Sequence, residues 1–128
     1  MTGDEITLSI PREQPFHEVA HLVLGGFAAR LNLTFDSLDD LETALNAVLE
    51  RAEMANDGHV TVRLRLDDGK ICAAVGPLPV ESLRSELERD PGSDVTLRRI
   101  LDTVVDRYEL DREGWIELTK QVELQEGA

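Results

Sequence analysis

Two histidines and a glutamate near the N-terminus are the first side chains in the chain that could do chemistry. The segment His17-Glu18-Val19-Ala20-His21 has the pattern H-E-x-x-H. On a helix, residues four apart share a face, so the two imidazoles could bind zinc beside a glutamate that acts as a general base. A catalytic zinc also needs a third protein ligand, and the remaining histidine, His59, does not stand at the spacing of the extended patterns. A zinc-dependent hydrolase through His17 and His21 therefore stays an alternative, and we expect His17 and Glu18 to be solvated residues of the first helical turn.

The other reactive side chains favour structural roles. Cys72 is the only cysteine, and we expect it to be a buried, small apolar residue of a strand. Arg63 and Arg65 would share one face of a strand, where they could bind an anion, but a solvent-exposed strand face is the simpler interpretation. The sequence contains no glycine-rich phosphate loop of the Walker or dinucleotide-binding type.

Length and charge limit the classes of protein to which the chain can belong. Its 128 residues and 41% hydrophobic content predict one folded domain, 1–128. A net charge of -13 would repel a phosphate backbone, so we expect no nucleic-acid partner. One cysteine cannot form an intrachain disulfide, and the sequence has neither a secretory signal nor an apolar segment long enough to span a membrane. These features predict a cytoplasmic protein.

Apolar residues recur three and four positions apart in two segments of the N-terminal half, which predicts two amphipathic helices. The clearer one covers residues 36–54 and would be capped by Asp36 or Ser37. The other covers residues 15–31 and is interrupted by Gly25-Gly26, which lowers its helix propensity. Two adjacent glycines would suit the close approach of another backbone.

Two more helices are predicted in the C-terminal half. A short one covers residues 80–88, after a stretch rich in proline. A long one would begin at Asp94 as its cap and continue to Leu110, with Val104 and Tyr108 on its buried stripe.

Alternating apolar and polar residues predict four strands, at 6–10, 59–66, 70–75 and 115–124. The first is short and belongs at the edge of a sheet. Asp68-Gly69 is typical of a tight turn that joins the second and third strands into an antiparallel hairpin. Helices and hairpin-linked strands in this order favour an α+β fold, a two-layer α/β sandwich.

The order of these elements resembles that of the anti-sigma regulatory factors, small bacterial serine/threonine kinases with the histidine-kinase-like (GHKL) ATPase fold, or Bergerat fold. ITLSIPREQPFHEVAHLVLGGFAARLNL is similar to their first strand and helix, FDSLDDLETALNAVLERA to the helix that carries their N-box, and TLRRILDTVVDRYELDREGWIELTKQV to their last helix and strand. The resemblance covers nearly the whole chain. It implies helices on one face of a mixed, mainly antiparallel sheet, with ATP and magnesium held between helices and a lid.

The resemblance also implies that the catalytic positions of the N-box helix have changed. The family places a glutamate there that activates the attacking group and, four residues later, an asparagine that holds magnesium. Ala47 and Arg51 stand at these positions. Alanine cannot act as a base, and arginine repels a metal ion. Asn46 and Glu50 have the required types in the reverse order.

The adenine and phosphate motifs are changed in the same way. The family's D-x-G-x-G motif corresponds to Ala74, Gly76 and Leu78, so only one glycine remains. The glycines at the end of the lid correspond to Asp94 and Thr96, which removes the backbone that cradles phosphates.

We therefore expect a non-catalytic, anti-sigma-factor-like regulator of transcription that acts by protein-protein binding and uses no cofactor. By resemblance, its partner is a sigma factor, a STAS-type antagonist or a second copy of the chain. The second copy would bind through the first strand and first helix. The residues expected to bind the partner are Phe16, His17, Ala20, His21 and Leu24. An active kinase that uses ATP and magnesium is the first alternative, and the zinc hydrolase is the second.

Overall fold

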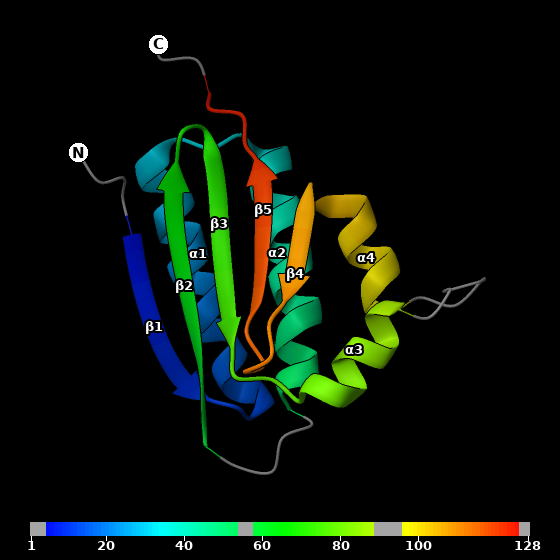
Figure 1. Ribbon diagram of the computed structural model, residues 1–128. Helices are drawn as coiled ribbons and strands as arrows, with labels where there is room; N and C mark the ends of the chain where they lie inside the picture. The colour runs from blue at the N-terminus through cyan, green and yellow to red at the C-terminus, as the bar shows by residue number, and fades with distance from the viewer. Residues whose placement is uncertain (1–4, 54–57, 89–95, 126–128) are drawn as a thin grey trace.

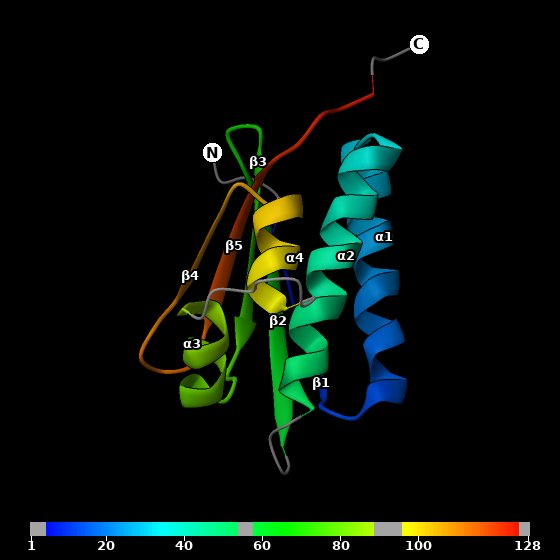
Figure 2. The ribbon, with the colours of Figure 1, turned by 90° about the vertical axis from the view of Figure 1, so that its right-hand side faces the viewer.

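A β-sheet and a layer of helices make up the part of the chain that the computed structural model describes, residues 5–53, 58–88 and 96–125 (Figure 1). In chain order the elements are β1 (Glu5–Pro11), a short 3-10 helix (Gln14–Phe16), α1 (His17–Leu31), α2 (Phe35–Ala52), β2 (His59–Asp67), β3 (Lys70–Gly76), α3 (Val80–Glu88), α4 (Leu97–Val104), β4 (Arg107–Leu110) and β5 (Ile116–Gln121). Seen from the side in Figure 2, α1 and α2 lie on one side of the sheet, and α3 overlaps its β4–β5 edge. The expected two-layer α+β sandwich is confirmed.

The described strands form one five-stranded sheet in the order β1-β2-β3-β5-β4. Every described pairing is antiparallel, so the sheet is not mixed in the way that the resemblance implied. As predicted, β1 lies at an edge and Asp68-Gly69 joins β2 to β3. Both turn residues have positive φ angles, 52° and 77°, which suit the twist of a two-residue hairpin.

The core lies between α1, α2 and α4 and one face of the sheet. Along β2 and β3 every second side chain is buried against the helices, because successive side chains of a strand point to opposite faces. The largest side chains with almost no exposed surface are Phe27, Leu24, Leu49, Ile71, Leu83, Leu97, Leu101, Ile116 and Leu118. Burying one leucine of this kind contributes about 1.5–3 kcal/mol to the free energy of unfolding. The other face of the sheet carries no helix (Figure 2).

The prediction of one long helix from Asp94 to Leu110 is wrong. Asp94 lies outside the described residues, Thr96 caps α4 by accepting a hydrogen bond from the Arg99 N–H at 3.2 Å, and the helix ends at Val104. Val105 is extended, and Tyr108 belongs to β4. Consecutive β-branched valines favour an extended backbone, and pairing with β5 stabilises it.

The cap predicted for the central helix is also wrong. Thr34, and not Asp36 or Ser37, precedes α2 and accepts a hydrogen bond from the Ser37 N–H at 3.3 Å. The Ser37 hydroxyl is buried and accepts from the Glu123 N–H at 3.0 Å, so it ties the helix to the C-terminal segment.

Gly25 and Gly26 do not mark a close approach within the described part of the chain. A Cβ atom at either position would meet no atom within 4 Å. The two glycines therefore leave open space beside α1, where a close backbone contact was expected.

Candidate functional site

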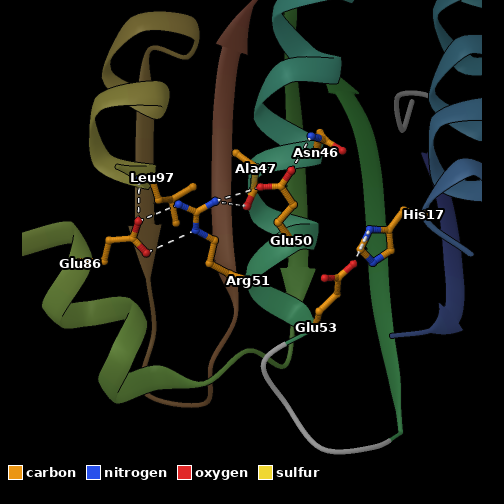
Figure 3. Close-up of polar contacts among 8 residues, drawn as sticks. All are labelled: His17, Asn46, Ala47, Glu50, Arg51, Glu53, Glu86 and Leu97. Atoms are coloured by element: carbon orange, nitrogen blue, oxygen red, sulfur yellow. Dashed lines mark hydrogen bonds and ion pairs between the residues drawn. The ribbon is translucent and has the colours of Figure 1, made fainter. Parts of the chain in front are cut away.

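Arg51, in the last turn of α2, is the centre of a polar cluster that joins three helices (Figure 3). Its Nη2 donates to Glu86 Oε2 at 2.8 Å and its Nε to Glu86 Oε1 at 3.3 Å, a bidentate pair between α2 and α3. Its Nη1 donates to the Ala47 carbonyl at 3.1 Å. Both charged side chains are largely covered, with 18% of Arg51 and 21% of Glu86 exposed.

Glu86 also connects this pair to the start of α4. Its Oε2 accepts a hydrogen bond from the Leu97 N–H at 2.8 Å, the first residue of that helix. Free N–H groups and the helix dipole make a helix N-terminus favourable for an anion. A carboxylate of the chain itself therefore takes the place at which a phosphate oxygen would be stabilised.

The space around the pair is small. The pocket lined by Arg51, Pro79, Ser82, Leu83 and Glu86 has a volume of about 30 Å³. Pockets that hold drug-sized ligands and cofactors measure roughly 300–1,000 Å³. The pocket can hold about one water molecule.

Ala47 and Arg51 lie one turn apart on α2, on the side from which Arg51 reaches Glu86 of α3. Ala47 is buried and contributes only its carbonyl oxygen to the cluster. Glu42 and Asn46, also on α2, have the glutamate and the asparagine in the order and at the spacing of four residues given for the family, and this pair was missed in the prediction from the sequence. Asn46 is exposed and donates to Glu50 Oε1 at 3.1 Å. Glu50 Oε2 lies 3.4 Å from Arg51 Nη1, so this carboxylate also faces the arginine.

The residues predicted at the adenine motif do not meet at one site. Ala74 belongs to the helix-free face of the sheet, where it lines a hollow with Trp115 and Glu117, so it cannot read a base held among the helices. Gly76 is buried beneath Trp115, and a Cβ there would approach the indole to 2.6 Å. Leu78 is buried, and its N–H donates to the Gly114 carbonyl at 2.7 Å. Gly76 is therefore explained by packing.

The two histidines of the H-E-x-x-H segment do not form a metal site with described residues. The prediction that His17 is solvated is wrong, because it is 5% exposed and its Nε2 donates to the Arg12 carbonyl at 3.0 Å. Its Nδ1 lies 3.7 Å from Glu53 Oε1 (Figure 3). Among the described residues, no group of three or more His, Cys, Asp or Glu side chains could hold a metal ion.

Cys72 is not buried as predicted. It is half-exposed on the helix-free face, where it lies opposite Arg65 in the register of β2 and β3. Arg63 and Arg65 are exposed, as expected, and the Arg63 guanidinium lies 5.7 Å from the centre of the Trp115 ring. Strand alternation predicts that alternate residues share a face, but it does not show which face the helices cover.

The partner-binding residues predicted on α1 divide into two groups. The side chains of His17, Ala20 and Leu24 are buried within the chain and cannot form a surface, so this part of the prediction is wrong. Phe16 is 40% exposed and His21 half-exposed. The large apolar side chains that α1 does expose are Val19 and Leu22, at 39% and 75%. Leu22 does not belong to the apolar residues that form the buried face of α1, and this could have identified it from the sequence as an exposed side chain.

Glu86 is the functional candidate that the sequence did not reveal. It is 35 residues from Arg51 and sits in a short helix with other acidic residues, so nothing local distinguishes it. Only the packing of α3 beside α2 brings it to the arginine.

Comparison with known proteins gives relatives that carry one name, serine-protein kinase RsbW. No family model matches the chain. The chain is 26% identical over 107 residues to the RsbW of Listeria monocytogenes, across 76% of this chain and 68% of that protein. It is 25% identical over 107 residues to that of Listeria innocua, with the same coverage. To that of Bacillus velezensis it is 32% identical over 73 residues, across 53% of this chain and 46% of that protein. The chain is related to the anti-sigma regulatory family with the histidine-kinase-like (GHKL) fold.

The fold agrees with the resemblance to this family. On α2, Arg51 binds Glu86. No helix in the described part of the chain is long and apolar enough to cross a membrane.

Proposed function

We propose that the chain is a non-catalytic, cytoplasmic member of the anti-sigma regulatory family, which acts by protein-protein binding and has lost its nucleotide site. The observation that carries this proposal is the contact of Arg51 with Glu86 and of Glu86 with the first N–H of α4, at 2.8 Å each.

In this contact, the charged groups of Arg51 and Glu86 take up positions that magnesium and the phosphates of ATP would otherwise need. Arg51 brings a fixed positive charge to the last turn of α2, and a metal ion held near it is repelled. Glu86 occupies the helix terminus that would otherwise stabilise a phosphate. Magnesium-ATP bound beside this pair would have to compete with its hydrogen bonds, and its phosphates would lie close to the Glu86 carboxylate, which repels them.

The partner is, by family resemblance, a sigma factor or a STAS-type antagonist. Protein binding does not require the nucleotide chemistry, so a closed site is compatible with a regulatory role. The surplus of 26 acidic over 13 basic residues favours a protein partner over nucleic acid.

Isothermal titration calorimetry with magnesium-ATP tests the proposal directly. We expect no heat of binding for the purified chain, and micromolar binding would contradict the proposal. The Glu86→Gln variant is the matched control, because the amide oxygen can still accept the Leu97 N–H while the ion pair with Arg51 is lost. If this variant binds ATP weakly and the parent chain does not, the ion pair is what excludes the nucleotide.

An active serine/threonine kinase is the second candidate, because the relatives of the chain are named serine-protein kinases. It predicts transfer of the γ-phosphate of ATP to a protein encoded beside the chain, with magnesium as the metal. Radiolabelled phosphate on that protein would support this alternative.

A further inference from the structure

A hollow opens on the helix-free face of the sheet, which is turned towards the viewer in Figure 1. It has a volume of about 420 Å³ and lies where β4 and β5 adjoin β3. We call it the carboxylate hollow, and its lining consists of Ala74, Glu109, Leu110, Asp111, Trp115 and Glu117. Arg51 and Glu86 do not line it, so it is separate from the polar cluster that joins the helices.

The charges that line the carboxylate hollow are all negative. Glu109, Asp111 and Glu117 are exposed, and of the described residues no lysine, arginine or histidine lines the hollow beside them. None of the three carboxylates forms an ion pair within the described part of the chain. Arg63 and Arg65 lie on β2, across β3, and line a separate hollow of about 50 Å³ that Glu117 borders from the other side. Charge therefore selects a cationic ligand.

Two of these carboxylates are placed so that they repel each other. In the antiparallel register of β4 and β5, Glu109 lies directly opposite Glu117. Side chains in such a pair have Cβ atoms about 4.5–5.5 Å apart, and like charges directly opposite destabilise the sheet. Asp111 Oδ1 accepts the N–H groups of Glu113 and Trp115, each at 2.9 Å, which fixes the third carboxylate. A cation held between Glu109 and Glu117 would replace their repulsion by two attractions.

The carboxylate hollow also has an apolar surface in a fixed position. The Trp115 ring lies over Gly76, where a Cβ atom would come within 2.6 Å of the indole, and Ala74 contributes a small side chain. The Arg63 guanidinium lies 5.7 Å from the ring centre, so the indole already has a cation beside it. A ligand would therefore place its aliphatic part against Trp115 and Ala74 and its charge between the carboxylates.

We propose that the carboxylate hollow binds an arginine side chain of a partner protein. A guanidinium is planar and has five N–H donors, enough to bind Glu109 and Glu117 at once, and the aliphatic stem of arginine can pack on the indole. The hollow is open on the face of a sheet, so a side chain carried by another protein suits it better than a small molecule, which needs to be enclosed. This interaction does not depend on the proposed function, because it holds whether or not the Arg51 site binds ATP.

The fluorescence of Trp115 measures binding at the carboxylate hollow directly, because it is the only tryptophan of the chain. The probe is a capped five-residue peptide with arginine at its centre and alanine and glycine around it. The control peptide has citrulline in place of the arginine, which keeps the shape and removes the charge. We expect the arginine peptide to change the emission of the full chain with a Kd of roughly 1 mM, and the citrulline peptide to bind at least about fivefold more weakly.

The Glu109→Gln/Glu117→Gln double variant should bind the arginine peptide about fivefold more weakly, since both charges that hold the guanidinium are lost while the side-chain shapes remain. The Glu5→Gln/Asp67→Asn double variant is the matched control, because it removes the same charge from exposed positions of β1 and β2. Its affinity should stay within about twofold of the parent chain. The inference is overturned if neither peptide changes the emission, if the citrulline peptide binds as tightly as the arginine peptide, or if both double variants lose affinity equally.

Discussion

At the scale of single residues, Arg51 joins α2 to α3 without changing how α2 folds. Its backbone continues α2 to Ala52, and its side chain leaves the helix face to reach Glu86. Because both groups remain partly solvated, the pair contributes only about 1–2 kcal/mol to the free energy of unfolding. Its effect on the fold is modest, whereas its effect on any incoming cation or phosphate is large, since either must displace a fixed partner.

Tyr108 offers a measurement of a single group. It is the only tyrosine of the chain, so the ultraviolet absorbance of phenolate follows this residue alone. We expect a midpoint at about pH 12, compared with the ordinary tyrosine pKa of 10.0, because burial and the hydrogen bond that it donates to Asp102 raise the pKa of Tyr108. Because the pKa is higher in the folded chain, the stabilising contribution of the neutral phenol is complete below pH 10 and is lost as the pH rises towards 12.

The control for this titration is Asp102→Asn, which removes the charge beside the phenol and should lower the pKa of Tyr108. Unfolding by urea at increasing pH gives the second measurement, and the Tyr108→Phe variant should lose the corresponding fall in stability. A midpoint near 10 in the native chain would contradict the position of Tyr108 against Asp102.

At the scale of the elements, two glycines have opposite roles that substitution can separate. Gly114 precedes β5 with φ +96°, and a Cβ there would come within 2.5 Å of the Leu78 carbonyl oxygen. We expect Gly114→Ala to lower the free energy of unfolding by about 2–3 kcal/mol, because the backbone must shift and the hydrogen bond from the Leu78 N–H is strained.

Gly25→Ala is the matched substitution in α1, where the added methyl group meets no atom within 4 Å. It should raise the free energy of unfolding by about 0.5–1 kcal/mol, since alanine loses less backbone entropy in a helix. Chemical denaturation of the two variants measures both effects. Equal destabilisation by both would show that the open space beside α1 is filled in solution.

Elements whose apolar residues recur at one regular spacing could be predicted from the sequence. Elements that depend on pairing with a distant strand could not. The apolar stripe predicted α2 correctly, and the alternation of apolar and polar residues predicted β2 and β3 correctly, because each pattern repeats several times along its element. Residues 104–110 fit a helical stripe as well as a strand, and only β5 decides between them. The same holds for the site. Arg51 could be singled out by its place on α2, but Glu86 could be found only once α3 was packed beside it.

At the scale of the whole molecule, the arrangement of layers leaves one side of α1 without cover. Phe16, Val19 and Leu22 are exposed there at spacings of three residues, and Gly25 leaves open space one turn further on. The neighbouring β1 is an edge strand of the sheet. Apolar side chains beside an unpaired strand edge are typical of a surface that another chain covers.

We therefore expect the chain to form a homodimer through α1 and β1. Introducing a charge with Leu22→Glu should convert the dimer into a monomer, because a buried and unpaired carboxylate costs several kcal/mol at an interface. Phe35→Glu is the matched control, since Phe35 is 77% exposed and Leu22 75%, but Phe35 lies at the start of α2.

Light scattering coupled to size-exclusion chromatography measures the mass of each variant. The parent chain and Phe35→Glu should have twice the mass of the monomer, 14.2 kDa, and Leu22→Glu should have that mass once. If the parent chain is a monomer, the homodimer is contradicted and the exposed side of α1 is available to a different protein. If both substitutions dissociate the dimer, the interface includes the start of α2.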